Sequence, residues 1–123
     1  MNAYKDELIV ESIDGTICPV RTAQKLVEGK WKVIILYYLS LKETRFNELQ
    51  KLIGNISHGV LSLQLKELEK SHLIHRKVFN EVPPRVEYSL TKTGEKFLPA
   101  MSVLVDFGRD YIKTHDVSFV EPD

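Results

Sequence analysis

Hydrophobic and polar residues follow two different periods along the chain, and the changes of period predict the order of its elements. The sequence predicts five helices, over residues 18–28, 30–41, 46–53, 57–71 and 91–115, and in the last three apolar residues recur at helical spacing. Two strand-like runs, at 74–79 and 85–90, flank a turn at 80–84, and in the second run apolar residues alternate with polar ones. Residues 44–45 have room only for a short extended stretch.

Local signals support the ends of the first helices. Pro19 occupies a favoured first helical position, and Gly29 ends the same helix. Gly54 ends the short helix over 46–53, and Ser57 is a good N-cap for the next one. The segment 30–41 contains the run WKVIILYYL, which is apolar on nearly all sides, so this helix is expected to be central and buried.

The helix over 57–71 has two unlike faces. Leu61, Leu65 and Leu68 recur at i, i+4 and i+7, as residues that pack against a core do. The opposite face carries small, polar and basic residues together with one leucine: Gly59, Ser62, Leu63, Lys66 and Lys70.

The hairpin that follows is expected to be stiff. In its second strand Val86, Tyr88 and Leu90 alternate with polar residues, which is the pattern of a half-buried edge strand. Pro83 and Pro84 remove backbone N–H donors from the turn and fix φ, so the loop cannot pair with other strand edges.

The last helix carries more apolar surface than a small core needs. Thr91 caps its start, and Pro99 lies inside it and is expected to kink it. A long apolar stripe of this kind indicates a partner helix, most simply from a second copy of the chain. The stripe consists of Phe97, Met101, Leu104, Val105, Gly108, Tyr111 and Ile112.

This order of elements predicts an α+β fold of the winged helix-turn-helix type, because two short helices joined by a tight turn precede a β-hairpin. At 123 residues the chain has room for one core, so we expect a single domain. Its expected parts are an N-terminal arm at 1–17, a winged-helix core at 18–91 with the wing at 79–86, a C-terminal dimerisation helix at 92–115 and a tail at 116–123.

Composition narrows the class of protein further. The longest apolar run, 33–39, is far too short to cross a bilayer, and the N-terminus shows no secretory signal. A single cysteine cannot form an internal disulfide, which agrees with a reducing compartment. We therefore expect a cytoplasmic protein that does not enter a membrane.

Charge is balanced overall but unevenly distributed. The formal net charge is zero, yet residues 44–86 hold seven basic and four acidic side chains, for a net charge of +3. Residues 1–43 are neutral and residues 87–123 carry −3. Any contact with nucleic acid is therefore expected in the middle block, which contains the hairpin and the helix over 57–71.

That middle block has the features that DNA recognition requires. A helix that enters the major groove presents short polar side chains to base edges, and its N-terminus can meet a phosphate. A stiff basic hairpin loses little entropy when it lies along the DNA backbone. Leu63 either touches a thymine methyl group or packs on the neighbouring helix. The candidate DNA-binding residues are Arg45, Ser57, His58, Ser62, Gln64, Lys66, Arg76, Lys77 and Arg85, the last expected at the tip of the hairpin.

Catalytic and metal sites are not indicated. His72 and His75 are three residues apart, but no cluster of carboxylates or thiols accompanies them. The sequence contains no Gly-rich phosphate loop, nucleophile elbow or zinc-protease motif, so neither an enzyme nor a cofactor is expected.

Several blocks of the chain resemble the HxlR family of bacterial winged-helix transcription regulators. They are Cys18-Pro19, GKWKVIILYYL (29–39), RFNEL (45–49), ISHGVLSLQLKELE (56–69) and VPPRVEYSLTKTG (82–94), within a similarity that spans about residues 18–111. The resemblance implies a homodimer built through the first and last helices, a recognition helix at 57–71 and a wing at 79–86. Two positions depart from the family pattern: Gly59 replaces a residue that is commonly basic, and Phe107-Gly108 replaces the usual Trp-Gly.

Cys18 is a second candidate site. It precedes Pro19 at a predicted helix N-terminus, where the helix dipole favours the thiolate and lowers the pKa of the thiol. Arg21 and Lys25 add positive potential if they face it. From position alone a lone cysteine is more often a small buried hydrophobe, but the resemblance implies a sensor thiol. Because the chain has no second cysteine, the alternatives are alkylation, a mixed disulfide with a small thiol, or a bridge between the Cys18 residues of two protomers.

Together these features predict a homodimeric transcription regulator that binds a pseudo-palindromic operator in double-stranded DNA and responds to a small thiol-reactive inducer through Cys18. One alternative is a winged-helix regulator switched by a small apolar effector held between the dimer helices. The other is a winged-helix protein-interaction module that does not bind DNA.

Overall fold

A computed structural model describes residues 17–115 of the chain. The predicted tail at 116–123 and all of the predicted arm except Ile17 lie outside the described residues. The helices and strands follow the chain in the order α2 (Pro19–Leu26), α3 (Lys32–Leu41), β1 (Thr44–Arg45), α4 (Phe46–Ile53), α5 (His58–Lys70), β2 (Ile74–Phe79), β3 (Arg85–Leu90), α6 (Lys92–Glu95) and α7 (Leu98–Thr114).

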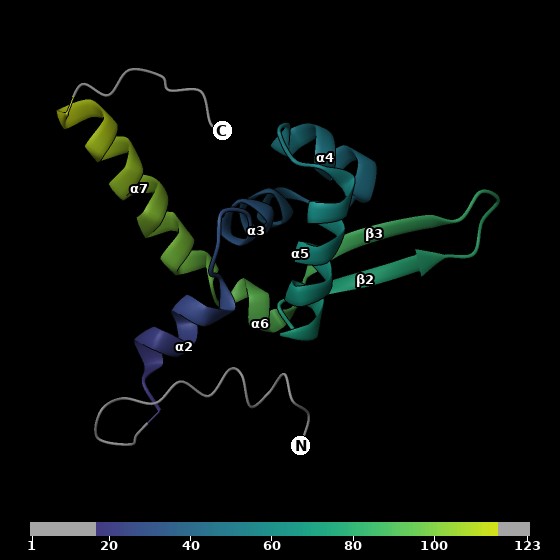
Figure 1. Cartoon of the computed structure of the whole chain (residues 1–123), viewed down its shortest axis with the longest axis horizontal. Coiled ribbons are helices and arrows are strands. Elements are labelled where there is room, and N and C mark those ends of the chain that lie inside the picture. The colour runs from purple at the N-terminus through teal and green to yellow at the C-terminus, as the bar shows by residue number, and fades with distance from the viewer. Residues whose placement is uncertain (1–16, 116–123) are drawn as a thin grey trace.

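The core lies where α3, α4 and α5 meet the small sheet (Figure 1). The three leucines predicted for the inner face of α5 are buried, as expected: Leu61 and Leu68 are 0% exposed and Leu65 is 1% exposed. They belong to one cluster of buried side chains, which also contains Ile35, Leu36, Leu39, Leu49, Ile56, Leu73, Ile74, Tyr88 and Met101. One continuous core therefore fixes α5 against the rest of the molecule.

Both ends of α5 are closed by hydrogen bonds. The Ser57 side chain accepts a hydrogen bond from the Val60 N–H at 3.2 Å, which confirms the predicted N-cap. At the other end His72 has a φ of +65°, and its N–H donates to the Glu69 carbonyl while the Leu73 N–H donates to the Leu68 carbonyl. This is a Schellman motif with histidine in the left-handed position that glycine usually occupies. It turns the chain directly from α5 into β2.

The sheet has three antiparallel strands in the order β1-β3-β2. Thr44 pairs with Tyr88 on one side of β3, and β2 pairs along all of β3 on the other, from Ile74 with Leu90 to Phe79 with Arg85. The prediction that β3 is an edge strand is therefore wrong. Its alternating pattern shows which side chains face the core, but it does not show that a two-residue strand covers its outer edge.

The predicted last helix is divided into two, so the prediction of one kinked helix over 91–115 is also wrong. Thr91 caps the short α6 by accepting a hydrogen bond from the Gly94 N–H at 2.9 Å. Pro99 then lies in the first turn of α7, where its missing N–H leaves no hydrogen bond unmade. Proline in a helix interior would clash with the carbonyl four residues earlier, so the chain begins a new helix instead.

α3 was expected to be central and buried; it contributes to the core, but only one side of it is buried. Ile35, Leu36 and Leu39 are at most 4% exposed, whereas Ile34 and Tyr37 are 38% and 39% exposed. An apolar helix of this kind has more hydrophobic surface than the core covers. Its exposed side continues onto α7, which contacts α3 and extends away from the body of the molecule (Figure 1).

The hairpin and α7 project from opposite sides of the α3–α5 body (Figure 1). The β2–β3 hairpin, with its loop at 80–84, is here called the wing. The two short helices α4 and α5 stand beside the wing, in the predicted winged helix-turn-helix arrangement. One end of the molecule therefore carries α5 and the wing, and the other carries α7.

Gly94 should be essential to the junction between α5 and α6. A Cβ added at Gly94 would lie 2.1 Å from the Leu73 carbonyl oxygen, which itself accepts a hydrogen bond from the Thr91 N–H. We expect Gly94→Ala to lower the free energy of unfolding by about 1–3 kcal/mol, measured by urea denaturation at fixed protein concentration. Gly59→Ala is the matched control, because nothing lies within 4 Å of a Cβ at that position. The control should be as stable as the parent or up to about 1 kcal/mol more stable; equal stability of the Gly94 variant would contradict the prediction.

Candidate nucleic-acid interface

The outer side of α5 is exposed along its length. Successive residues of an α-helix are rotated by about 100°, so the direction opposite the three buried leucines falls between Gly59, Leu63, Lys66 and Lys70. All four of these residues are exposed, and Ser62 beside them is half-buried. The core thus occupies one side of α5 and leaves the other side with small, polar, basic and apolar groups.

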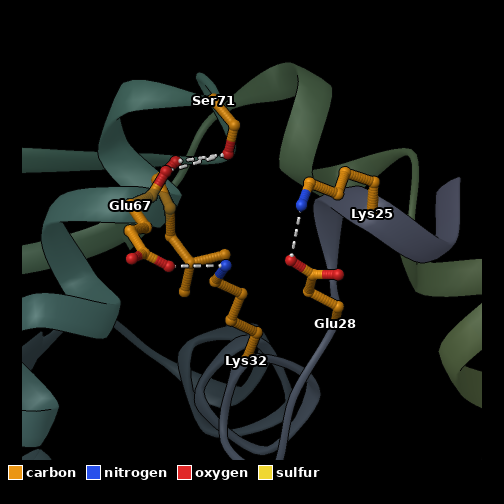
Figure 2. A network of polar contacts seen from close by, with 6 residues as sticks. Lys25, Glu28, Lys32, Glu67 and Ser71 are labelled. Carbon is orange, nitrogen blue, oxygen red and sulfur yellow. Dashed lines mark hydrogen bonds and ion pairs between the residues drawn. The ribbon is translucent and has the colours of Figure 1, made fainter. Parts of the chain in front are cut away.

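An ion pair between α3 and α5 fixes this orientation (Figure 2). The Lys32 ammonium lies 2.8 Å from a Glu67 carboxylate oxygen, and the Lys32 side chain is only 8% exposed. Glu67 lies on the flank of α5, and its backbone carbonyl also accepts a hydrogen bond from the Ser71 hydroxyl at 3.1 Å. A buried ammonium without its carboxylate is strongly unfavourable, so α5 cannot rotate away from α3 without a large cost.

The N-terminal turn of α5 carries two of the predicted contact residues. The Ser57 oxygen is already an acceptor within the helix, and its hydroxyl hydrogen is left as a donor. His58 is exposed, and its ring packs on the Phe46 ring with 4.5 Å between centroids. Phe46 begins α4, so this ring contact sets the position of His58 relative to the neighbouring helix. Because the Phe46 side chain is apolar, the sequence indicates a core residue at this position. Phe46 was therefore not among the predicted site residues.

A hollow of about 440 Å³ lies between α5 and the sheet. It brings four predicted contact residues from two elements together: His58, Ser62 and Lys66 from α5 and Arg76 from β2. Glu69 is the acidic residue in its lining. The full lining is Phe46, His58, Ser62, Lys66, Glu69, Arg76, Val86 and Tyr88. A phosphate group in this hollow would meet two cations.

Two of the arginines near the wing, Arg45 and Arg85, are engaged with acidic partners. Arg85 lies at the start of β3 and not at the loop tip, and its side chain is only 27% exposed. Its guanidinium lies 3.1 Å from Glu81 and 3.3 Å from Glu87 and stacks over the Phe79 ring at 3.9 Å. The predicted position of Arg85 at the tip is therefore wrong. The loop tip instead exposes Val82.

Arg45 reaches the same cluster from β1. Its Nε lies 3.8 Å from a Glu87 carboxylate oxygen, because strand pairing places Arg45 opposite Glu87. Arg85 and Glu87 are two residues apart on one strand and so share a face, a signal that is present in the sequence. The approach of Arg45 depends on the β1–β3 pairing, which the sequence does not indicate.

The last two predicted residues lie apart from the hollow. Lys77 is exposed on β2, and its ammonium lies 4.9 Å from the centroid of the Phe79 ring. Gln64 is half-buried on the flank of α5 opposite His58 and Ser62. The structure therefore gathers most of the predicted residues around α5 and the wing, with Gln64 on the far flank.

Cys18 lies at the other end of the molecule, as the residue that precedes α2. It is half-buried, its side chain makes no capping hydrogen bond, and its carbonyl accepts a hydrogen bond from the Thr22 N–H at 2.9 Å. Lys25, predicted to add positive potential, pairs with Glu28 at 3.0 Å (Figure 2). No residue of α2 is buried. A change in packing around Cys18 therefore does not have to expose a buried residue of this helix.

An apolar surface covers α7 and the outer side of α3. A shallow hollow of about 250 Å³ lies between the two helices and is lined by Val33, Ile34, Tyr37, Met101, Leu104 and Val105. Along α7 the Phe107 and Tyr111 rings lie 6.5 Å apart, and Tyr111 stacks on His115 at 4.3 Å. The strongly exposed apolar side chains of α7 are Val103, Leu104, Phe107, Tyr111 and Ile112.

Metal sites and membrane spans are both absent from residues 17–115. No three His, Cys, Asp or Glu side chains gather there in a way that would hold a metal ion. Among the same residues no helix combines the length and the apolar character needed to cross a membrane.

Comparison with known proteins identifies the family. The model of the HxlR-like helix-turn-helix family matches residues 26–116. An HTH-type transcriptional regulator of Bacillus subtilis strain 168, YdeP, is 47% identical over 94 residues, which are 76% of this chain and 73% of YdeP.

Solved structures of the redox regulator HypR have the same fold. The reduced form matches with a TM-score of 0.77 and 35% identity over 80% of this chain and 98% of that one. The oxidised form matches with a TM-score of 0.73 and 39% identity over 76% and 96%. These relatives are transcription regulators and not enzymes. The chain therefore belongs to the HxlR-like helix-turn-helix family of transcription regulators.

Proposed function

We propose that this regulator is a cytoplasmic homodimer that binds a pseudo-palindromic operator in double-stranded DNA and releases it when Cys18 is modified. One observation carries the proposal: α5 is fixed to the core on one side and presents an exposed, polar and basic side beside the wing. A fixed helix with one open side has the form of an element that enters the major groove.

The contacts follow from where the cations lie. We assign base edges to the outer side of α5, including Ser62, and assign phosphates to Lys66 and Arg76 at the hollow and to Lys77 on β2. The N-terminal turn with Ser57 and His58 is placed to meet a further phosphate, because the backbone N–H groups of His58 and Gly59 precede the first intrahelical hydrogen bond, from the Leu61 N–H to the Ser57 carbonyl. Gln64, on the far flank, would reach only the edge of the groove.

Arg45 and Arg85 are weaker candidates for phosphate contact. For either to contact a phosphate, the phosphate has to compete with Glu81 or Glu87, which the two guanidinium groups already meet. Exchange of one anion for another gains less than capture of an anion by an unpaired cation. We therefore assign Arg85 mainly to holding the wing in shape and Arg45 to a weaker phosphate contact.

The dimer is assigned to α7, with α2 and the outer side of α3. Several large apolar side chains of α7 lie exposed there, at 48–67% of their surface, and contiguous exposed apolar side chains of this kind mark interaction surfaces. A second copy of α7 would cover them in a symmetric pair, which would also place two α5 helices at the two halves of a pseudo-palindromic site.

Cys18 is assigned as the sensing thiol because HypR, a redox regulator known in reduced and oxidised forms, shares the fold at 35–39% identity. With a quinone the reaction needs no separate oxidant. The thiolate sulfur adds to a ring carbon, a C–S bond forms, and the displaced electron pair moves onto a carbonyl oxygen. Two protonations, with loss of the ring proton at the carbon attacked, then give a hydroquinone thioether. The bulky product would alter the packing around the start of α2.

A small apolar effector between α3 and α7 is the second candidate for the signal. The hollow there is lined almost entirely by apolar residues. Its volume of about 250 Å³ is below the 300–1,000 Å³ typical of small-molecule sites. A side chain of the partner protomer fills such a hollow better than a separate ligand, so the thiol is preferred.

DNA binding should depend more on Lys66 than on Arg85. We expect Lys66→Ala to weaken binding to an operator selected from random duplex DNA, and to reduce the slope of log affinity against log salt by about one for each phosphate that the variant leaves unneutralised. Arg85→Ala is the matched comparison and should change the slope less, since its charge is already paired. Fluorescence anisotropy at several salt concentrations measures both. An unchanged slope for Lys66→Ala would remove it from the interface, and a chain that selects no duplex would be an interaction module.

Self-association should depend on Phe107. Phe107→Glu would place two charges in the apolar dimer interface and weaken association about a hundredfold, measured by sedimentation equilibrium. Val78→Glu is the control, because Val78 is similarly exposed, at 51% against 67%, but lies on β2 in the wing. Equal association constants for the two variants would contradict the assigned interface.

The release of DNA by a thiol-reactive compound should require the Cys18 sulfur. Treatment with a benzoquinone should abolish operator binding by the parent protein, with one adduct at Cys18 seen by mass spectrometry. Cys18→Ser should bind the operator as tightly as the untreated parent and keep that affinity after treatment. If the serine variant is also released from DNA, the signal does not act through Cys18, and the hollow between α3 and α7 becomes the preferred site.

A further inference from the structure

We propose that Leu63 reads the 5-methyl group of a thymine in each half of the operator, so that part of the sequence specificity is apolar. This inference rests on the proposed DNA-binding function and deepens it, because it names the chemical group that the centre of α5 recognises. The juxtaposition that carries it is an exposed leucine at the middle of the open side of α5, preceded one turn earlier by a glycine.

A single exposed leucine is common on protein surfaces, so exposure alone decides nothing. The position of Leu63 is what matters. It points almost directly away from the buried leucines, at the centre of the open side, and it is 53% exposed. More than half of the Leu63 side chain is exposed, and it is not among the partly buried side chains packed against the core, which disfavours the alternative that it packs on a neighbouring helix.

The surroundings of Leu63 favour close approach to a base pair. Gly59 lies one turn earlier on the same side, and nothing lies within 4 Å of the place where its Cβ would be. The helix surface is therefore low at that point, and the Leu63 side chain projects beyond it. Val60, 38% exposed, adds a second apolar group one turn before Leu63 on the adjoining flank.

The major groove offers one apolar group, the C5 methyl of thymine. The other atoms that bases present there are hydrogen-bond donors and acceptors, which a leucine would desolvate without replacing their bonds. A leucine at the centre of the open side of α5 thus favours a T·A pair at that point and disfavours the others. Ser62 and Lys66 lie together on one flank of Leu63, toward the sheet, and can bond to neighbouring base edges or phosphates.

The test removes the methyl group and nothing else. The full chain is first used to select a binding sequence from random duplex DNA, and each thymine of that sequence is then replaced in turn by uracil, which keeps the same pairing. We expect one thymine in each half-site at which the change weakens binding about threefold to fivefold, as removal of one buried methyl group predicts.

The same comparison in two variants assigns the effect to its side chain. In Leu63→Ala the ratio of thymine to uracil affinity at that position should fall to about one, because the partner of the methyl group has gone. Alanine is the best helix former, so the variant should keep its fold, checked by circular dichroism. Leu52→Ala is the matched control, since Leu52 is 44% exposed on α4, and it should keep the full ratio.

The outcomes separate the inference from the function beneath it. If the chain selects an operator but no thymine is sensitive to its methyl group, or if Leu63→Ala keeps the full ratio, the inference is overturned and the proposed function stands. If the chain selects no sequence at all, the proposed function fails and the inference fails with it.

Discussion

The rotational setting of α5 is the constraint on which the rest of the structure depends. Three leucines at 0–1% exposure hold one side of the helix in the core, and the Lys32–Glu67 pair holds its flank to α3. A shift by one residue would rotate every side chain by about 100°, which would take leucines out of the core and separate a buried ammonium from its carboxylate. The residues on the open side are therefore fixed by what is buried on the other side. Any surface that α5 offers to DNA follows from packing first and from its own chemistry second.

The distribution of charge limits the electrostatic contribution that the proposed interface can make to DNA binding. The chain has no net charge, and two of the arginines in its basic block are held by Glu81 and Glu87 within the wing. The long-range attraction to DNA that a strongly basic domain enjoys is therefore weak here. Under the proposed mode of binding, affinity would then depend on a few well-placed cations and on the fit of α5 in the groove, and apolar contacts in that groove would be relatively more important.

Periodicity predicts α3, α4, α5, β2 and β3 well, because each has a repeating apolar face or clear end signals such as Ser57 and Gly54. It fails where an element depends on a distant partner. β3 is central only because Thr44 and Arg45 pair with it, and a two-residue strand has no period of its own. Pro99 falls within a continuous apolar stripe and so suggests a kink, although proline is better tolerated at a helix start, and the buried Gly94 allows a turn before it.

The candidate site is predictable to a similar degree and for the same reasons. Lys66, Ser62 and Arg76 come together because the predicted helix and hairpin pack as expected. The engagement of Arg45 and Arg85 by acidic residues is harder to predict, since the cluster depends on strand pairing and on the fold of the loop at 80–84. In general the sequence indicates which side chains are exposed. Which of these side chains already bind a neighbouring residue is decided by tertiary contacts.

α3 connects the two ends of the molecule, and this limits how the proposed signal can reach DNA. Its N-terminus follows α2 after only the segment 27–31, in which Val27 and Trp31 pack against the core. Lys32 comes next and binds Glu67 of α5, beside the Lys25–Glu28 pair of the α2 region (Figure 2). Under the proposed thiol response, a displacement of α2 at Cys18 would reach the residue that sets the rotation of α5. The other route would run through the proposed dimer, since α7 contacts α3. Both routes reach α3, whose Lys32 holds Glu67 of α5.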